Sequence, residues 1–231
     1  MKTRKAMKCK TCRTGATTGF EPVLNLEAWN TKDSLRESHN CFAYAMNAVD
    51  ATLLQKCKDE PNCDVGFHQP GYAAGFKKFS EQHEKGCGDM VSRLWGDNPT
   101  ILASSFNDKC PYGTSKIALI VDPKRDYHFI RQDDDGYWSH KPGAMNATRF
   151  DASNRPILRP DRALFLYRKH KEPLLYTKFC GYFCVPRGQP LHMMTTVRSG
   201  GYSVSDVSSH IPSRYQLTRR RSRGAPHSSI H

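Results

Sequence analysis

The sequence lacks long apolar runs. Its apolar stretches are short, such as residues 117–121, and fall far below the roughly 20 residues that a membrane-spanning helix requires. No apolar stretch follows the charged residues 1–8, so we expect no secretory signal peptide. These absences argue against a transmembrane helix and lead us to expect a cytosolic origin.

Acidic side chains are also scarce, with 22 Asp and Glu against 35 Lys and Arg, which gives a formal net charge of +13. Much of this surplus lies at the two ends of the chain, in residues 1–13 and 214–223. Basic ends attract acidic partners such as nucleic acid, an anionic membrane surface or an acidic protein. A solubilising tail explains the same charge equally well. No recognition module accompanies the charge, which argues against sequence-specific nucleic-acid binding.

Composition divides the chain into four segments. Residues 1–30 are basic and lack a sustained hydrophobic period, so we expect an N-terminal arm. Residues 31–170 contain the helix and strand patterns and are long enough to bury one core. Residues 171–190 form a cysteine-containing extension, and residues 191–231 form a basic tail rich in Ser, Gly and Arg.

Helical patterns come first within the predicted domain. Asn40 has a side chain typical of a helix N-cap, and residues 41–54 continue with apolar side chains at helical spacing. This places Cys41 in the first turn of a predicted helix. A turn signal at 68–71 precedes two more predicted helices, over 72–82 and 87–95.

After Pro111 the hydrophobic period changes from helical to extended. Strands are predicted over residues 116–122, 127–132, 137–140 and 162–167, with a turn at 133–136. Residues 173–186 predict a hairpin held together by Cys180 and Cys184 or by a metal ion. Helices followed by an antiparallel sheet define an α+β fold.

The chain contains nine cysteines, an odd number that leaves one thiol over if the others pair or bind metal. Disulfides Cys57–Cys63 and Cys87–Cys110 are one interpretation, if the protein matures in an oxidising setting or inside a virus particle. A tetrahedral thiolate site for structural zinc is the other interpretation, with the ligands Cys9, Cys12, Cys180 and Cys184. Free buried thiols remain the simplest alternative for every pair.

Thiol chemistry needs a sulfur with a lowered pKa and an imidazole that exchanges its proton. A helix N-terminus stabilises a thiolate, and Cys41 is predicted to lie at one. His128 and His140 lie on adjacent predicted strands, where both imidazoles can share one face of a hairpin. A cysteine early in an apolar helix is otherwise more often a packed core residue, and the histidines can be an ordinary cross-strand pair.

Two stretches carry a resemblance to known proteins: Asn-Cys-Phe-Ala-Tyr-Ala at 40–45, and the segment 126–143 that contains both histidines. A Cys that opens a helix, a His that opens a strand and a polar residue on the next strand resemble the papain-like thiol hydrolases. The Cys-His-His order is most similar to the NlpC-type peptidases. Both stretches also resemble uncharacterised proteins of large DNA viruses and phages.

The resemblance implies a papain-like or NlpC-like α+β fold, in which the Cys-bearing helix packs on an antiparallel sheet and basic extended arms flank the domain. It implies that Cys41 is the nucleophile, His128 the general base and later acid, and His140 the residue that orients His128. The oxyanion hole is then assigned to the Cys41 backbone amide, with Asn40 or Ser38 as helpers.

Two functions follow from these patterns. The first is a thiol hydrolase or acyltransferase that acts on a peptide or amide substrate and requires no cofactor. The second is a non-catalytic minor capsid or core protein, whose basic arms bind viral structural proteins or nucleic acid. Both place the protein in a virion or the host cytoplasm. Residues 146–148 fit the N-glycosylation pattern. Because we expect no signal peptide, this pattern alone does not predict a glycan.

Overall fold

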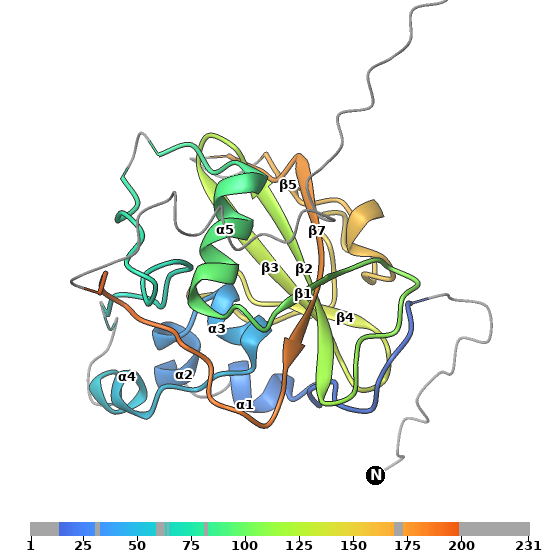
Figure 1. Cartoon of the computed structure of the whole chain (residues 1–231), viewed down its shortest axis with the longest axis horizontal. Helices are drawn as coiled ribbons and strands as arrows, with labels where there is room; N and C mark the ends of the chain where they lie inside the picture. Colours follow the sequence, from blue (N-terminus) through green and yellow to red (C-terminus); the bar gives the residue numbers. More distant parts are fainter. Residues whose placement is uncertain are drawn as a thin grey trace, which may run out of the picture.

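The computed structural model describes residues 14–30, 33–58, 63, 65–80, 83–168 and 173–198. Predictions that concern Cys9, Cys12 and the segment from residue 199 onward lie outside the described residues. Within the described part the chain combines short helices with a five-stranded antiparallel sheet in the order β1-β7-β2-β3-β4 (Figure 1). The prediction of an α+β fold with an antiparallel sheet is therefore confirmed.

The strands of this sheet are β1 (Leu102–Ser104), β7 (Lys178–Pro186), β2 (Thr114–Asp122), β3 (Asp126–Gln132) and β4 (Trp138–His140). A separate two-stranded sheet pairs β5 (Leu166–Tyr167) with β6 (Leu174–Leu175). The helices are α1 (Leu26–Asn30), α2 (Asp33–Ser38), α3 (Cys41–Met46), α4 (Ala51–Lys56), α5 (Cys87–Asp97) and the 3-10 helix η1 (Pro160–Arg162).

Strands β2, β3 and β4 lie where local patterns predicted them. The turn between β3 and β4 closes with a hydrogen bond from the Gly136 N–H to the Asp133 carbonyl, and Gly136 takes a φ of 86°, which glycine adopts without strain. Strand β2 is buried almost throughout, and its residues 117–121 are all apolar because both faces of the strand are covered.

The predicted helix over 41–54 is two helices instead of one. Asn47 adopts a left-handed conformation with a φ of 55° and ends α3, because its backbone leaves the helical region. Asp50 then caps α4 by accepting hydrogen bonds from the backbone N–H groups of Thr52 and Leu53. Local helix propensity did not reveal this break.

The helix predicted over 72–82 is absent from its described part, residues 72–80. Gly71 and Gly75 both take positive φ angles, which interrupt a right-handed helix. The carboxylate of Asp97 accepts the N–H groups of Gly71 and Ala74, so a side chain from α5 satisfies this backbone and no helix is needed.

The segment expected to be an extension, residues 171–190, contributes β7 as an interior strand of the main sheet, between β1 and β2. Strand β7 pairs with β1 on one side and β2 on the other, and β6 pairs with β5, so residues 173–186 form no hairpin with each other. The expected N-terminal arm also packs in part: Trp29 in α1 is buried, and the Thr14 carbonyl accepts a hydrogen bond from the Trp138 indole.

Two core clusters cover the two faces of the main sheet. Ile117, Leu119 and Val121 of β2 face the cluster that includes residues of α3 and α5, while Ala118 and Ile120 face the opposite cluster. Figure 1 shows α5 lying along the sheet with α3 near one end of it. Each fully buried aliphatic or aromatic side chain contributes about 1.5–3 kcal/mol to the free energy of folding.

Three disulfides link cysteines of the described residues. Cys57 and Cys63 are joined as predicted. The predicted pair Cys87–Cys110 is wrong, because Cys87 bonds to Cys180 and Cys110 bonds to Cys184. The error arises because β7 pairs with strands distant in sequence, and spacing along the chain does not reveal that pairing.

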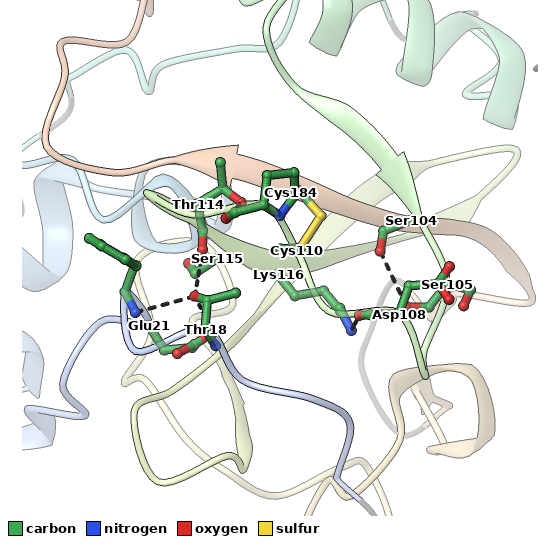
Figure 2. Close-up of a disulfide and its surroundings, with 12 residues drawn as sticks. Thr18, Glu21, Ser104, Ser105, Asp108, Cys110, Thr114, Ser115, Lys116 and Cys184 are labelled. Carbon is green, nitrogen blue, oxygen red and sulfur yellow. Dashed lines mark hydrogen bonds between the residues drawn. A yellow bond between two sulfur atoms is a disulfide. The ribbon is translucent and has the colours of Figure 1, made fainter.

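These two long-range disulfides lie on opposite faces of β7. Cys87 and Cys180 pack against the cluster that holds α3 and α5. Lys116 and Ala118 are two residues apart on β2, so their side chains point to the same face, where Ala118 belongs to the opposite cluster. Cys184 lies directly across from Lys116 in the sheet and therefore points to that face as well. Figure 2 shows the Cys110–Cys184 bond beside Lys116, whose ammonium donates to the Asp108 carbonyl. The start of α5 on one face of the sheet and the loop before β2 on the other are thus covalently tied to β7.

Buried cationic side chains hold further loops through their backbone carbonyls. Arg131 donates to the carbonyls of Tyr44 and Val23, and Lys141 donates to those of Arg36, His39 and Gly143. Each ammonium or guanidinium offers several donors, so one side chain satisfies several carbonyls that would otherwise be buried without partners. Among the described residues, the buried Lys116 and Arg93 and the half-buried Arg187 also donate to backbone carbonyls.

Candidate functional site

Cys41 is the first residue of α3, directly after Asn40, whose side chain accepts the Ala43 N–H as the predicted cap. The residue is only 5% exposed. Its Sγ lies 4.0 Å from the Tyr127 carbonyl oxygen, and its side chain packs in the cluster that contains Phe42 and Phe129. The sulfur is therefore surrounded by hydrocarbon and backbone.

The electrostatics of this position oppose a thiolate. Burial raises the pKa of the Cys41 thiol to about 12, and the nearby Asp126 carboxylate contributes to the rise. A thiol nucleophile needs the opposite shift, toward or below neutral pH. Cys41 is thus protonated at physiological pH and serves as a small apolar core residue.

His128 and His140 form a close buried pair, as their positions on β3 and β4 predicted. His128 Nε2 lies 2.7 Å from His140 Nδ1, and His140 Nε2 lies 3.0 Å from the Phe150 carbonyl oxygen. Because a carbonyl oxygen only accepts, His140 Nε2 carries the hydrogen, and its Nδ1 accepts from His128 Nε2. Burial lowers the pKa of His140 to about 4 and that of His128 well below its ordinary value.

The structure brings the two histidines together but does not bring Cys41 to them. His128 lies between Tyr127 and Phe129 on β3, and both of those rings belong to the Cys41 cluster. Successive side chains of a strand point to opposite faces, so the His128 ring points away from Cys41. It lies instead near Phe165 and Tyr176, on the other face of the sheet.

The two residues assigned to the oxyanion hole have structural partners. The Asn40 amide donates to the His68 carbonyl at 2.9 Å, in addition to capping α3. The Ser38 hydroxyl lies 2.7 Å from His39 Nδ1. Both residues are buried, and their hydrogen bonds are made to the protein itself. They therefore stabilise the segment that leads into α3.

The cysteines assigned to zinc do not form a described metal site. Cys180 and Cys184 are oxidised in disulfides and have no thiolate to offer. Cys9 and Cys12 lie outside the described residues. Among the residues with described positions, no group of three or more His, Cys, Asp or Glu side chains is arranged to hold a metal ion.

Sequence reasoning missed a second buried histidine network. His39 Nε2 accepts the Asp50 N–H at 2.8 Å, and His68 Nε2 lies 3.1 Å from the Asp50 carboxylate. Burial lowers the pKa of His39 to about 4. The sequence carries no signal for this network, because it joins the loop before α3 to segments that lie further along the chain.

The fold and its cysteine bonds define a class: a small α+β domain held by disulfides on both faces of its sheet, with no assembled thiol site among the described residues. None of the helices in the described ranges has the length and apolar character that crossing a bilayer demands. Disulfides and buried polar contacts hold a domain of this class together.

Comparison with curated proteins identifies a relative. The chain is 35% identical over 147 residues to insoluble matrix shell protein 1 of Ruditapes philippinarum, a match that covers 63% of this chain and 80% of that protein. The chain therefore belongs to the same family as that shell protein. No family model matches the sequence, and no solved structure matches the fold.

This relationship corrects the expected identity. The resemblance to papain-like and NlpC-type enzymes, and to proteins of large DNA viruses and phages, is wrong, because the relative found is a matrix shell protein. The predicted thiol hydrolase or acyltransferase, and the alternative of a viral capsid or core protein, are wrong for the same reason. In the motif at 40–45, Asn40 caps α3 and the residues after it pack in the core. The sequence of such a capped, buried helix looks like that of an active-site helix, but its structure does not form one.

Proposed function

We propose that this protein is a structural component of an insoluble extracellular matrix, and that it acts through a cross-linked fold and its charge. The relative named above is, by its name, a protein of such a matrix in a shell. The described residues fit a structural role, since their one free cysteine, Cys41, is buried and its thiol has a raised pKa.

The observation that carries the proposal is the pair of disulfides on the two faces of β7, Cys87–Cys180 and Cys110–Cys184. Disulfides form and persist in oxidising compartments, and are rare where glutathione keeps thiols reduced. They favour an extracellular location over the virion or host cytoplasm that the sequence led us to expect. A matrix protein also gains from cross-links, which keep the fold intact outside the cell.

For partners, we infer acidic polymers of the matrix. Residues 1–13 contain six basic and no acidic side chains, and residues 214–223 contain five arginines. Such ends attract polyanions and release their counterions, so the affinity falls steeply as the salt concentration rises. The partner that we propose is still acidic, as the sequence led us to expect. It is a polyanion of the matrix, in place of viral proteins or nucleic acid.

Two measurements test these points. Immunogold labelling of source tissue should place the chain in extracellular matrix, and labelling confined to the cytosol contradicts the proposal. For the partner, the oxidised full-length protein should sediment with alginate, an acidic polysaccharide, and not with neutral dextran. A variant with Gln in place of Arg214, Arg219, Arg220, Arg221 and Arg223 should bind alginate less and show a weaker salt dependence. Unchanged binding by this variant contradicts the assignment to the C-terminal arginines.

A further inference from the structure

The loop that follows β4 carries a short polar motif. Residues 146–148 read Asn-Ala-Thr and are the single Asn-X-Ser/Thr sequon in the sequence, with Ala rather than Pro in the middle position. A sequon is a weak signal in a reduced cytosolic protein. The disulfides described above place this one in a different context, because they indicate passage through an oxidising compartment.

The loop is firmly anchored on one side of the sequon. The Asn30 side chain donates to the Ala147 carbonyl at 3.0 Å and accepts the Ala147 N–H at 2.7 Å. Thr148 and His140 exchange two backbone hydrogen bonds, at 2.8 and 2.9 Å. Ala147 is consequently buried, and the backbone of the sequon is fixed by α1 and the end of β4.

Asn146 itself faces outward from this anchored backbone. It is exposed, and its side chain makes no hydrogen bond to the part of the chain that the structure describes. The side chain lines an open cleft of about 660 Å³, beside Arg36, Phe67 and Met145. A bulky group on the Asn146 amide therefore points into this cleft, and adding it displaces no hydrogen bond made by the Asn146 side chain among the described residues.

We propose that Asn146 is an N-glycosylation site. The inference rests on the secretion that the proposed function requires. In the transfer, the Asn146 amide nitrogen forms a bond to the anomeric carbon of a lipid-pyrophosphate-linked oligosaccharide. The bond from that carbon to the phosphate oxygen breaks, the lipid pyrophosphate leaves, and the amide loses one proton to a base of the transferase.

A glycan at this position has a structural consequence. Met145, which is 60% exposed, lies beside Asn146 on the rim of the same cleft. The first sugars attached to Asn146 extend over this apolar side chain and into the cleft. The glycan therefore makes a partly apolar rim hydrophilic.

The test uses the full chain, expressed behind a secretory leader in animal cells. Treatment with peptide N-glycosidase should shift the secreted protein by the mass of one glycan and convert Asn146 to Asp, which peptide mass spectrometry detects. N146Q should lose the shift. T148S should keep it, because serine preserves both the sequon and the hydroxyl that accepts the Phe150 N–H. T148A should lose it.

The outcomes separate this inference from the proposed function. Secreted protein with its disulfides formed and Asn146 unmodified overturns the glycosylation site and leaves the matrix role standing. Glycosylated protein that is absent from the extracellular matrix of the source tissue overturns the matrix role alone. If T148A fails to fold, N146Q still decides the question, because the Asn146 side chain has no partner to lose among the described residues.

Discussion

Cys41 and His128 lie on opposite faces of the same sheet. The Cys41 side chain packs with Tyr127 and Phe129, the two chain neighbours of His128, and the His128 ring packs near Phe165 and Tyr176 on the far side. A proton transfer between them would have to cross the backbone of β3. The sulfur and the imidazole pair are therefore two separate core features.

The first prediction concerns thiol reactivity. Native oxidised protein treated with iodoacetamide should leave Cys41 unlabelled at pH 7.5, because the thiol is buried and its pKa is raised to about 12. Denaturant should make Cys41 react completely, which peptide mass spectrometry quantifies. Rapid labelling of Cys41 in the native state would show that the sulfur is accessible and ionised.

The second prediction compares the disulfides. Replacing Cys87 and Cys180 with alanine should lower the free energy of unfolding by roughly 3–4 kcal/mol in the chain-entropy model. The sequence separation is 93, but the intact Cys110–Cys184 bond already shortens the loop that Cys87–Cys180 closes in the unfolded chain. The matched variant lacking Cys57–Cys63, with a separation of 6, should lose only about 2 kcal/mol. Urea unfolding measures both, and equal losses would mean that loop size does not set the effect.

The third prediction concerns pH. His128 and His140 are neutral in the folded state, since burial lowers the pKa of both, that of His140 to about 4. Protons bind the unfolded chain first, so stability is full above the ordinary histidine pKa of about 6.5 and falls as the pH drops toward 4. At pH 5 His140 alone should cost about 2 kcal/mol.

Urea unfolding from pH 7.5 to pH 5 checks this dependence. The double variant H128Q/H140Q should lose less stability on acidification than the parent protein, because it lacks both titrating rings. Other titratable groups, including the buried His39, are present in both proteins, so the difference isolates the pair. Parallel stability curves for the two proteins would exclude these histidines as the source.

The fourth prediction concerns the buried ion pair of Arg131 and Asp133, which lie 3.0 Å apart with both side chains fully buried. R131M should destabilise the fold by roughly 3–5 kcal/mol, because it leaves the Asp133 carboxylate and the Tyr44 and Val23 carbonyls without this donor. R162M, at an exposed position, is the matched control and should cost less than about 0.5 kcal/mol. Similar losses in both variants would contradict the role of Arg131.

The sequence predicted those parts of the fold that local patterns determine. Alternation and turn residues located β2, β3 and β4, and Asn40 located the start of α3, because these signals lie within a few neighbouring residues. Strand β7 and its two disulfides were misassigned, because their partners lie far along the chain.

The candidate site failed for a related physical reason. The closeness of His128 and His140 follows from a tight two-strand connection, which local sequence reveals. Apolar residues flank His128 on both sides, and both faces of β3 are buried, so the sequence does not show which face α3 covers. Only the packing of α3 against Tyr127 and Phe129 decides it.

The most direct test of the account is a disulfide map of the native protein. Tissue of the source organism is separated into soluble cytosol and insoluble extracellular matrix, free thiols are blocked, and non-reduced peptides are sequenced by mass spectrometry. We predict the chain in the matrix fraction, with peptides linked through Cys87–Cys180 and Cys110–Cys184 and with Cys41 free. Recovery from the cytosol with these four cysteines reduced would contradict the account.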